Sequence, residues 1–323
     1  MNAPPFLVNF SSLEEYLRAL PIELQTIYGT EIGHLVAQQL PPIVSRRCLG
    51  ALFGFSAQFI GTLFFHTERY YRLFQIKKGK KIRTIQAPRV ALKVIQKWFG
   101  HHLASSLTFH ESVFGFVSGR SAVQAAAVHC GAKWIYSVDI KDFFPSTSMQ
   151  TVIIALMNVG YGRPGAELIA KLCCYKGALS QGSPASPILS NLTFKQIDEE
   201  LFKLSRRYDI HFTRYADDIV FSGMNSFPSD IKDEIVSIVQ SRGWMLSRNK
   251  EYYAERPGRL KVYGLLVSGQ RPRLTKGYRN RIRAFTHLLA EGRISDKDVS
   301  RVKGHLSYAN SIEAFDMSLG DDT

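Results

Sequence analysis

The sequence predicts an α+β fold, in which strands and helices are mixed without the regular strand–helix alternation of a doubly wound sheet. Segments with strand-like alternation or short apolar runs are interspersed with segments of helical periodicity along the 323 residues. The expected strands span residues 75–87, 133–139, 210–222 and 259–268, and the expected helices span residues 11–39, 90–103, 149–174, 228–243 and most of the chain beyond 275. The length and a hydrophobic fraction of 45% are sufficient for about two or three compact units with a sizeable core.

Local signals support the main elements. Ser12 and Glu15 have the spacing of a helix capping box at the start of the first helical region. Basic and apolar residues alternate on both sides of Gly79, which predicts a β-hairpin whose solvent face consists of Lys and Arg. The helical region 149–174 contains a turn at residues 160–165, and the apolar runs 210–215 and 219–222 predict a second hairpin.

The positive charge is unevenly distributed. Basic residues outnumber acidic ones by 41 to 27, which gives a formal net charge of +14. Residues 69–97 contain ten Lys or Arg and no acid, and residues 271–310 contain ten against three acids, so the rest of the chain is slightly acidic. This excess predicts a polyanionic partner, either nucleic acid or an acidic membrane surface.

The four cysteines do not form a disulfide framework, because two of them are adjacent, and no histidine stands beside them at metal-ligand spacing. We expect buried free thiols in a reducing, cytoplasmic environment, and no signal peptide at the N-terminus. Residues 48–65 carry no charge, but they are short and contain three glycines with Ser, Gln and Thr. A buried helix is therefore expected there, and no membrane span.

Three aspartates stand where the predicted strands end. Asp139 closes the strand at 133–139, and Asp217 and Asp218 lie at the tip of the second hairpin, after Ala216. Like charges in a half-buried turn repel one another and lose solvation, so a divalent cation is the natural compensation. Carboxylate oxygens suit Mg²⁺, and two ions about 4 Å apart can hold both oxygens of a phosphoryl displacement. The alternative is a polar turn with exposed carboxylates.

Several further motifs accompany these acids in a fixed order along the chain. A Gly115–Ser121 loop precedes the Asp139 strand, Gln181-Gly182 opens a loop that continues to Ser186-Pro187, and Asn249-Lys250 and Val262-Tyr263-Gly264 follow the acidic hairpin. In this order, from about residue 65 to residue 310, the chain resembles the reverse transcriptases.

The resemblance implies a right-hand polymerase with fingers, a palm built on a ferredoxin-like antiparallel sheet, and a helical thumb. Residues 1–64 would form a helical N-terminal extension and residues 65–130 the fingers. Residues 131–275 would form the palm, with fingers helices inserted at about 149–180, and residues 276–323 the thumb. Val262-Tyr263-Gly264 would be the last palm strand.

The resemblance also implies roles at the active centre. Asp139, Asp217 and Asp218 would hold two Mg²⁺ ions, one at the primer hydroxyl and one at the triphosphate. Gln181 and the Gly182 amide would position the nucleotide. Lys250 would protonate or screen the leaving pyrophosphate, its alternative being a surface lysine.

Other residues would contact the nucleotide or the nucleic acid. Lys81 and Arg83 would face the triphosphate, although a solvated charged hairpin is the alternative. Phe144 would lie beneath the sugar and exclude a 2′-hydroxyl, so that the product is DNA, its alternative being a core aromatic; Phe143 beside it is expected to be core.

Three arginines and a histidine would bind nucleic acid: Arg120 in the fingers loop, His129, and Arg279 and Arg283 on one face of a thumb helix.

Among reverse transcriptases the chain most resembles the retron enzymes of bacteria. His129 matches the Asn-Ala-x-x-His element of that group, but Ala125 replaces its Asn, and Tyr263 replaces the Thr of its Val-Thr-Gly element. The implied partners are a structured non-coding RNA, which is copied from a 2′-hydroxyl of the same RNA, dNTPs, and an effector protein in defence against phage, with no membrane. The alternatives are another bacterial reverse transcriptase, group II intron-like or defence-associated, a viral-type RNA polymerase, and a catalytically idle RNA-binding protein.

Overall fold

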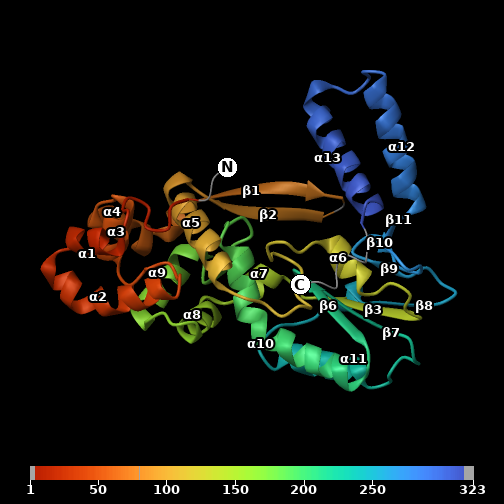
Figure 1. The fold of residues 1–323 in the computed structure, drawn as a ribbon, viewed down its shortest axis with the longest axis horizontal. Helices are drawn as coiled ribbons and strands as arrows, with labels where there is room; N and C mark the ends of the chain where they lie inside the picture. Colours follow the sequence, from red (N-terminus) through yellow and green to blue (C-terminus); the bar gives the residue numbers. More distant parts are fainter. Residues whose placement is uncertain (1–3, 80, 316–323) are drawn as a thin grey trace. The chain divides into compact units, whose positions relative to one another are not determined.

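A computed structural model describes residues 4–79 and 81–315, which fall into two compact units of interleaved segments (Figure 1). The first unit comprises Met1–His110, Phe116–Ser118 and Lys141–Gln196, and the second comprises Glu111–Gly115, Gly119–Ile140 and Ile197–Thr323. The helices expected in the thumb group with the palm sheet in the second unit. Residues 141–148, expected in the palm, group with the N-terminal helices and the first hairpin.

The second unit is built on a four-stranded antiparallel sheet with the order β6-β7-β3-β8 (Figure 1). Its strands are β3 (Trp134–Asp139), β6 (His211–Tyr215), β7 (Asp218–Gly223) and β8 (Tyr252–Glu255). Helix α10 (Ser186–Arg207) precedes β6, and α11 (Ile231–Gln240) lies between β7 and β8. This order of strands and helices is the ferredoxin-like arrangement that the resemblance implied.

A small sheet in the second unit corrects the strand expected at residues 259–268. Here β9 (Lys261–Val262), β10 (Leu265–Leu266) and β11 (Arg273–Leu274) pair in the order β11-β10-β9. Tyr263 and Gly264 have φ angles of 48° and 87°, and positive φ at both central residues is the signature of a two-residue hairpin turn. Val262-Tyr263-Gly264 is therefore the end of a strand and its turn, not one strand.

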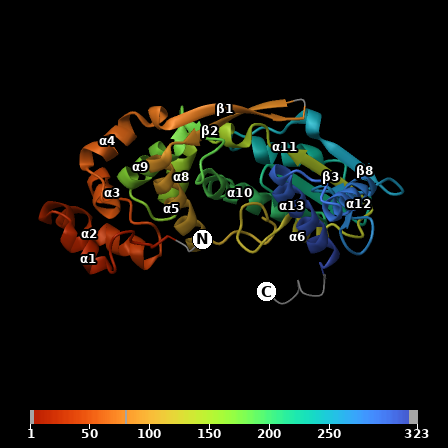
Figure 2. The ribbon, with the colours of Figure 1, turned by 90° about the horizontal axis from the view of Figure 1, so that it is seen from above.

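Two helices, α12 (Lys276–Ala290) and α13 (Asp296–Glu313), follow the small sheet and lie side by side in both views (Figures 1 and 2). The Tyr278 hydroxyl and His305 Nδ1 are 2.7 Å apart, and the Phe285 ring packs 5.4 Å from that of His305. Ala309 and Ile312 of α13 are buried in the cluster that contains the strands of the small sheet. The helical structure expected beyond residue 275 is therefore confirmed and consists of two helices.

The first unit begins with the helices α1 (Leu13–Ala19), α2 (Ile22–Ala37), α3 (Arg46–Phe53), α4 (Ala57–Phe65) and η1 (Thr67–Tyr70). The uncharged stretch at 48–65 forms two helices, not the single helix expected, because Gly54 has a φ of 68° and ends α3. Ser56 then caps α4 by accepting from the Phe59 amide at 3.1 Å. Among the described helices, none has the length and apolarity needed to cross a membrane.

The basic hairpin consists of β1 (Tyr71–Lys78) and β2 (Lys81–Pro88), paired antiparallel along their whole length. Its exposed side chains are not only basic: Leu73, Phe74, Ile76 and Ile82 are each at least 40% exposed, and they lie on both faces. The expectation of a purely basic solvent face is therefore wrong, because neither face of this two-stranded ribbon is fully covered.

The remaining elements are α5 (Val90–Ser106), α6 (Ala122–Ala127), α7 (Phe143–Ser146), α8 (Met149–Asn158), α9 (Arg163–Cys173), β4 (Cys174–Tyr175), β5 (Ala178–Leu179) and η2 (Arg248–Lys250). The interruption between α8 and α9 confirms that a turn divides this helical region, but it lies at residues 159–162, and residues 163–165 already belong to α9. All four cysteines are free thiols.

Candidate active site

A two-residue turn joins β6 to β7 and carries the adjacent acids. Ala216 and Asp217 form the turn, Ala216 with a φ of 57°, and Asp218 is the first residue of β7. The hairpin with the acids at its tip, expected from the apolar runs on either side, is confirmed.

The register of the palm sheet places the third acid beside this turn. Asp139, the last residue of β3, pairs directly with Asp218, and the Ile140 amide donates to the Asp217 carbonyl at 2.9 Å. Side chains directly opposite one another in an antiparallel pair have Cβ atoms roughly 5 Å apart, where like charges destabilise the sheet. Three residues separated by up to 79 positions are thus gathered at one end of the sheet.

The crowded negative charge at this end of the sheet affects the pKa values of its carboxyl groups. Loss of solvation and the charges of Asp217 and Asp139 raise the pKa of Asp218 to about 6. Loss of solvation and the charge of Asp139 also raise the pKa of Asp217. Asp218 remains exposed and Asp217 is half-buried, so a diffusing cation can reach both.

Asp139 is the buried member of the group, with 8% of its side chain exposed. Its carboxylate accepts from Lys250 Nζ in an ion pair and from the Ser247 hydroxyl at 3.2 Å. Lys250 itself is partly exposed. Lys250 is therefore held against a carboxylate and is not a free surface lysine, and the Ser247 contact was missed by sequence reasoning.

The donor set suits a hard divalent cation, because it consists of carboxylates whose mutual repulsion a cation would relieve. The described part of the chain holds no ready-made group of three His, Cys, Asp or Glu side chains at ligand distance. In the chain without metal, the ammonium of Lys250 supplies positive charge at Asp139.

The Gln181-Gly182 loop belongs to the first unit, where it is joined to β2. The Gln86 amide donates to the Gln181 carbonyl at 3.0 Å, and the Gln181 amide donates to the Gln86 side chain at 2.7 Å. Gly182 has a φ of 144°, and a Cβ there would lie 2.6 Å from the Gln86 carbonyl oxygen. Arg83, also on β2, is exposed, whereas the side chain of Lys81 lies outside the described part of the structure.

Phe143 and Phe144 lie in the short helix α7, beyond the end of the strand that closes at Asp139. Phe143 is buried and packs edge-to-face on Phe194, which confirms it as core. Phe144 is half-buried, and its ring centroid lies 6.1 Å from that of Phe116 in the same unit. The half-exposed ring leaves Phe144 available to a ligand.

His129 corrects an expectation. It is completely buried, and its ring nitrogens are each 2.7 Å from a hydroxyl, Nδ1 from Ser222 and Nε2 from Thr213. Burial and the charge of His211 lower the pKa of His129 to about 3, so the ring is neutral at physiological pH. A ring without solvent exposure does not contact nucleic acid, and His129 instead ties β6 to β7.

The three arginines proposed for nucleic acid have different environments. Arg279 and Arg283 are exposed on α12, as is Arg281. Arg120 is half-buried, and its Nη1 donates to the Val113 carbonyl at 2.6 Å. Arg120 thus supports the backbone that precedes it.

Sequence reasoning missed Arg214 and Asp198, which form a buried ion pair beside the acidic turn. The signal was present in the sequence, because an arginine within an apolar strand next to two acids requires a partner in the interior.

Comparisons with known proteins show the family of the chain. Residues 76–256, more than half of the chain, match the family described as reverse transcriptase (RNA-dependent DNA polymerase). The retron Ec86 reverse transcriptase of Escherichia coli is 31% identical over 264 residues, which cover 80% of this chain and 82% of that protein. The retron Mx65 reverse transcriptase of Myxococcus xanthus is also 31% identical over 264 residues, covering 76% of this chain and 62% of that protein.

Among solved structures, the telomerase of Candida albicans aligns with a TM-score of 0.45 at 10% identity, over 68% of this chain and 50% of that one. The sequence similarity accords with the ferredoxin-like sheet and the three acids at its end. The chain therefore belongs to the reverse transcriptases, as an RNA-directed DNA polymerase of the retron type.

Proposed function

We propose that Asp139, Asp217 and Asp218 form the catalytic centre and hold two Mg²⁺ ions. The observation that carries this proposal is the register that sets Asp139 opposite Asp218, with Asp217 in the adjoining turn. Bound metal would supply positive charge at the primer hydroxyl and at the triphosphate. Reverse transcriptases use divalent metal ions, and the crowded carboxylates of this chain need one to relieve their repulsion.

Residues of the first unit would bind the incoming deoxynucleotide. Lys81 and Arg83 on β2 would contact its phosphates, and Gln181 and Gly182 would position its sugar and base. The half-exposed ring of Phe144 would exclude a ribose. The hydrogen bonds between Gln86 and Gln181 support this proposal, because they join the loop to the basic hairpin.

The template would be a structured non-coding RNA, primed from one of its own 2′-hydroxyls. The enzyme would act together with an effector protein against phage in the cytoplasm. The similarity to retron enzymes and the two basic stretches support an RNA partner. Sequencing the nucleic acid that co-purifies with the chain tests this directly. A branched RNA–DNA species supports the proposal, and linear cDNA from many transcripts contradicts it.

The catalytic proposal is tested by extension of a primed RNA template with dNTPs and Mg²⁺. Asp217→Asn should abolish extension and leave RNA affinity near the wild-type value. Asp209→Asn is the matched control, because Asp209 is an exposed residue just before β6 whose φ of 52° suits asparagine. Mg²⁺-dependent synthesis by the Asp217→Asn variant would contradict the assignment.

A further inference from the structure

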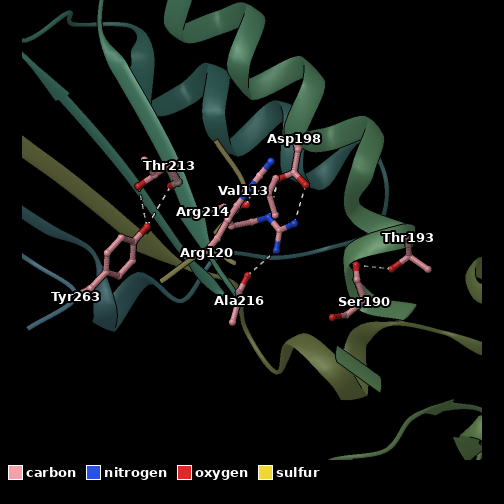
Figure 3. Close-up of polar contacts among 9 residues, drawn as sticks. All are labelled: Val113, Arg120, Ser190, Thr193, Asp198, Thr213, Arg214, Ala216 and Tyr263. Carbon is pink, nitrogen blue, oxygen red and sulfur yellow. Dashed lines mark hydrogen bonds and ion pairs between the residues drawn. The ribbon is translucent and has the colours of Figure 1, made fainter. Parts of the chain in front are cut away.

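Arg214 is a fully buried arginine one residue before Tyr215 and the acidic turn (Figure 3). Its Nε and Nη2 each donate to one carboxylate oxygen of Asp198, on α10, at 2.6 Å. The two side chains are 0% and 1% exposed. This planar, two-bonded geometry fixes the guanidinium in one orientation.

The remaining arm of the guanidinium reaches the turn itself. Nη1 of Arg214 donates to the Ala216 carbonyl at 2.9 Å, as Figure 3 shows. That carbonyl belongs to the peptide group that joins Ala216 to Asp217. On the other side of the same turn, the Asp217 carbonyl accepts from the Ile140 amide at 2.9 Å. Both carbonyls of the two-residue turn are therefore held by hydrogen bonds.

The backbone of Ser112–Gly115 lies against the same residues. The Arg214 amide donates to the Ser112 carbonyl at 2.8 Å, and the Phe114 amide donates to the Arg214 carbonyl at 2.9 Å. At Gly115 a Cβ atom would lie only 2.1 Å from the Ala216 nitrogen, so no other residue fits without displacing the turn.

We propose that Arg214 is a positioning residue for polymerisation: anchored by Asp198, it holds the peptide before Asp217 and so fixes the direction of that carboxylate. This inference rests on the proposed catalytic role of Asp217. Gly115 contributes to the same positioning, because the absence of a side chain lets its backbone pack directly against Ala216.

Energetic considerations favour a positioning role over a stabilising one. Replacing both members of a buried ion pair with apolar residues of similar volume is often neutral or stabilising, whereas removing one member is strongly destabilising. Stability alone therefore gives little reason to use this pair. A guanidinium suits the position because its three nitrogens serve three oxygens at once, which a lysine cannot reproduce in the same geometry.

The decisive variant replaces the whole pair, Arg214→Met with Asp198→Leu, so that no unpaired charge is left buried. We expect a thermal midpoint and an affinity for primed RNA close to the wild-type values. The kcat for dNTP addition should fall by at least about tenfold, since small misplacements of catalytic groups are costly. Binding of Mn²⁺, followed by its EPR signal without nucleotide, should weaken severalfold.

Two single variants keep the inference testable if the pair variant does not fold. Gly115→Ala leaves the ion pair intact but pushes on Ala216, and it should lower kcat and Mn²⁺ affinity. Its matched control is Gly33→Ala on α2, where a Cβ meets nothing within 4 Å. Arg214→Lys keeps the positive charge and should fold, but its kcat should be lowered as in the pair variant.

Wild-type kcat and Mn²⁺ affinity in the folded pair variant, or in both single variants, would overturn the inference. Asp217→Asn is measured in the same assay. If Asp217→Asn is inactive while the pair variant is fully active, only the positioning role fails. If Asp217→Asn is active, the proposed catalytic centre fails.

Discussion

His129 should make the folded protein sensitive to acid. Its ring is buried between two hydroxyl groups, and burial lowers its pKa from 6.5 to about 3. The unfolded chain therefore takes up a proton on this ring at a higher pH than the folded chain does. The stability that the neutral ring contributes is complete above pH 6.5 and is lost as the pH falls from 6.5 towards 3.

The size of the effect follows from the pKa difference. Each pH unit below 6.5 costs about 1.4 kcal/mol of unfolding free energy while the folded ring stays neutral. Between pH 7.5 and pH 5.0 the wild type should therefore lose about 2 kcal/mol through His129 alone. Other groups titrate in the same range, so the effect must be isolated by comparison with a variant that lacks the titration.

His129→Gln supplies that comparison, because glutamine is neutral and can still bond one of the two hydroxyls. Urea unfolding followed by tryptophan fluorescence reports on the second unit through Trp134, which is buried in β3. We expect the wild type to lose about 2 kcal/mol more than His129→Gln on going from pH 7.5 to pH 5.0. His101→Gln, which replaces an exposed histidine of α5, should show the wild-type loss. Equal losses in wild type and His129→Gln would refute the buried neutral ring.

Three further predictions concern the centre, the nucleotide and the thumb. Asp218→Asn should stabilise the metal-free protein at pH 7.5 by at most about 1 kcal/mol after solvent screening, because the raised pKa of Asp218 makes its ionisation costly to the fold. At pH 4 the substitution should not stabilise the protein. Thermal melting in EDTA at the two pH values checks this. Phe144→Ala should admit ribonucleotides, measured as rNTP against dNTP incorporation, and an unchanged preference would place the selectivity elsewhere. Arg279→Ala with Arg283→Ala should reduce the magnitude of the negative slope of log affinity against log salt for duplex by about 1.8, whereas Arg281→Ala should change it less. Titration of a primed template at several salt concentrations measures these slopes.

The sequence by itself determined the elements whose cause is local. Apolar runs on both sides of Ala216 and Asp217 leave those residues only a turn, so the hairpin followed from periodicity and turn chemistry. The order of the motifs indicated the polymerase, and the apolar and basic pattern after residue 275 indicated helical structure, but not its division into two helices. At Tyr263 the same reasoning failed, because alternation does not show that a tyrosine adopts positive φ.

The tertiary structure alone decided which polar side chains face one another. His129 was expected to bind nucleic acid, and Arg214 was not singled out from the sequence, yet both are buried and bonded to partners. Their partners come from other segments: Ser222 lies 93 residues from His129, and Asp198 is supplied by the helix before the Arg214 strand. A buried charge or ring is tolerated only where such partners meet it, and sheet register and helix packing, not local pattern, bring them together.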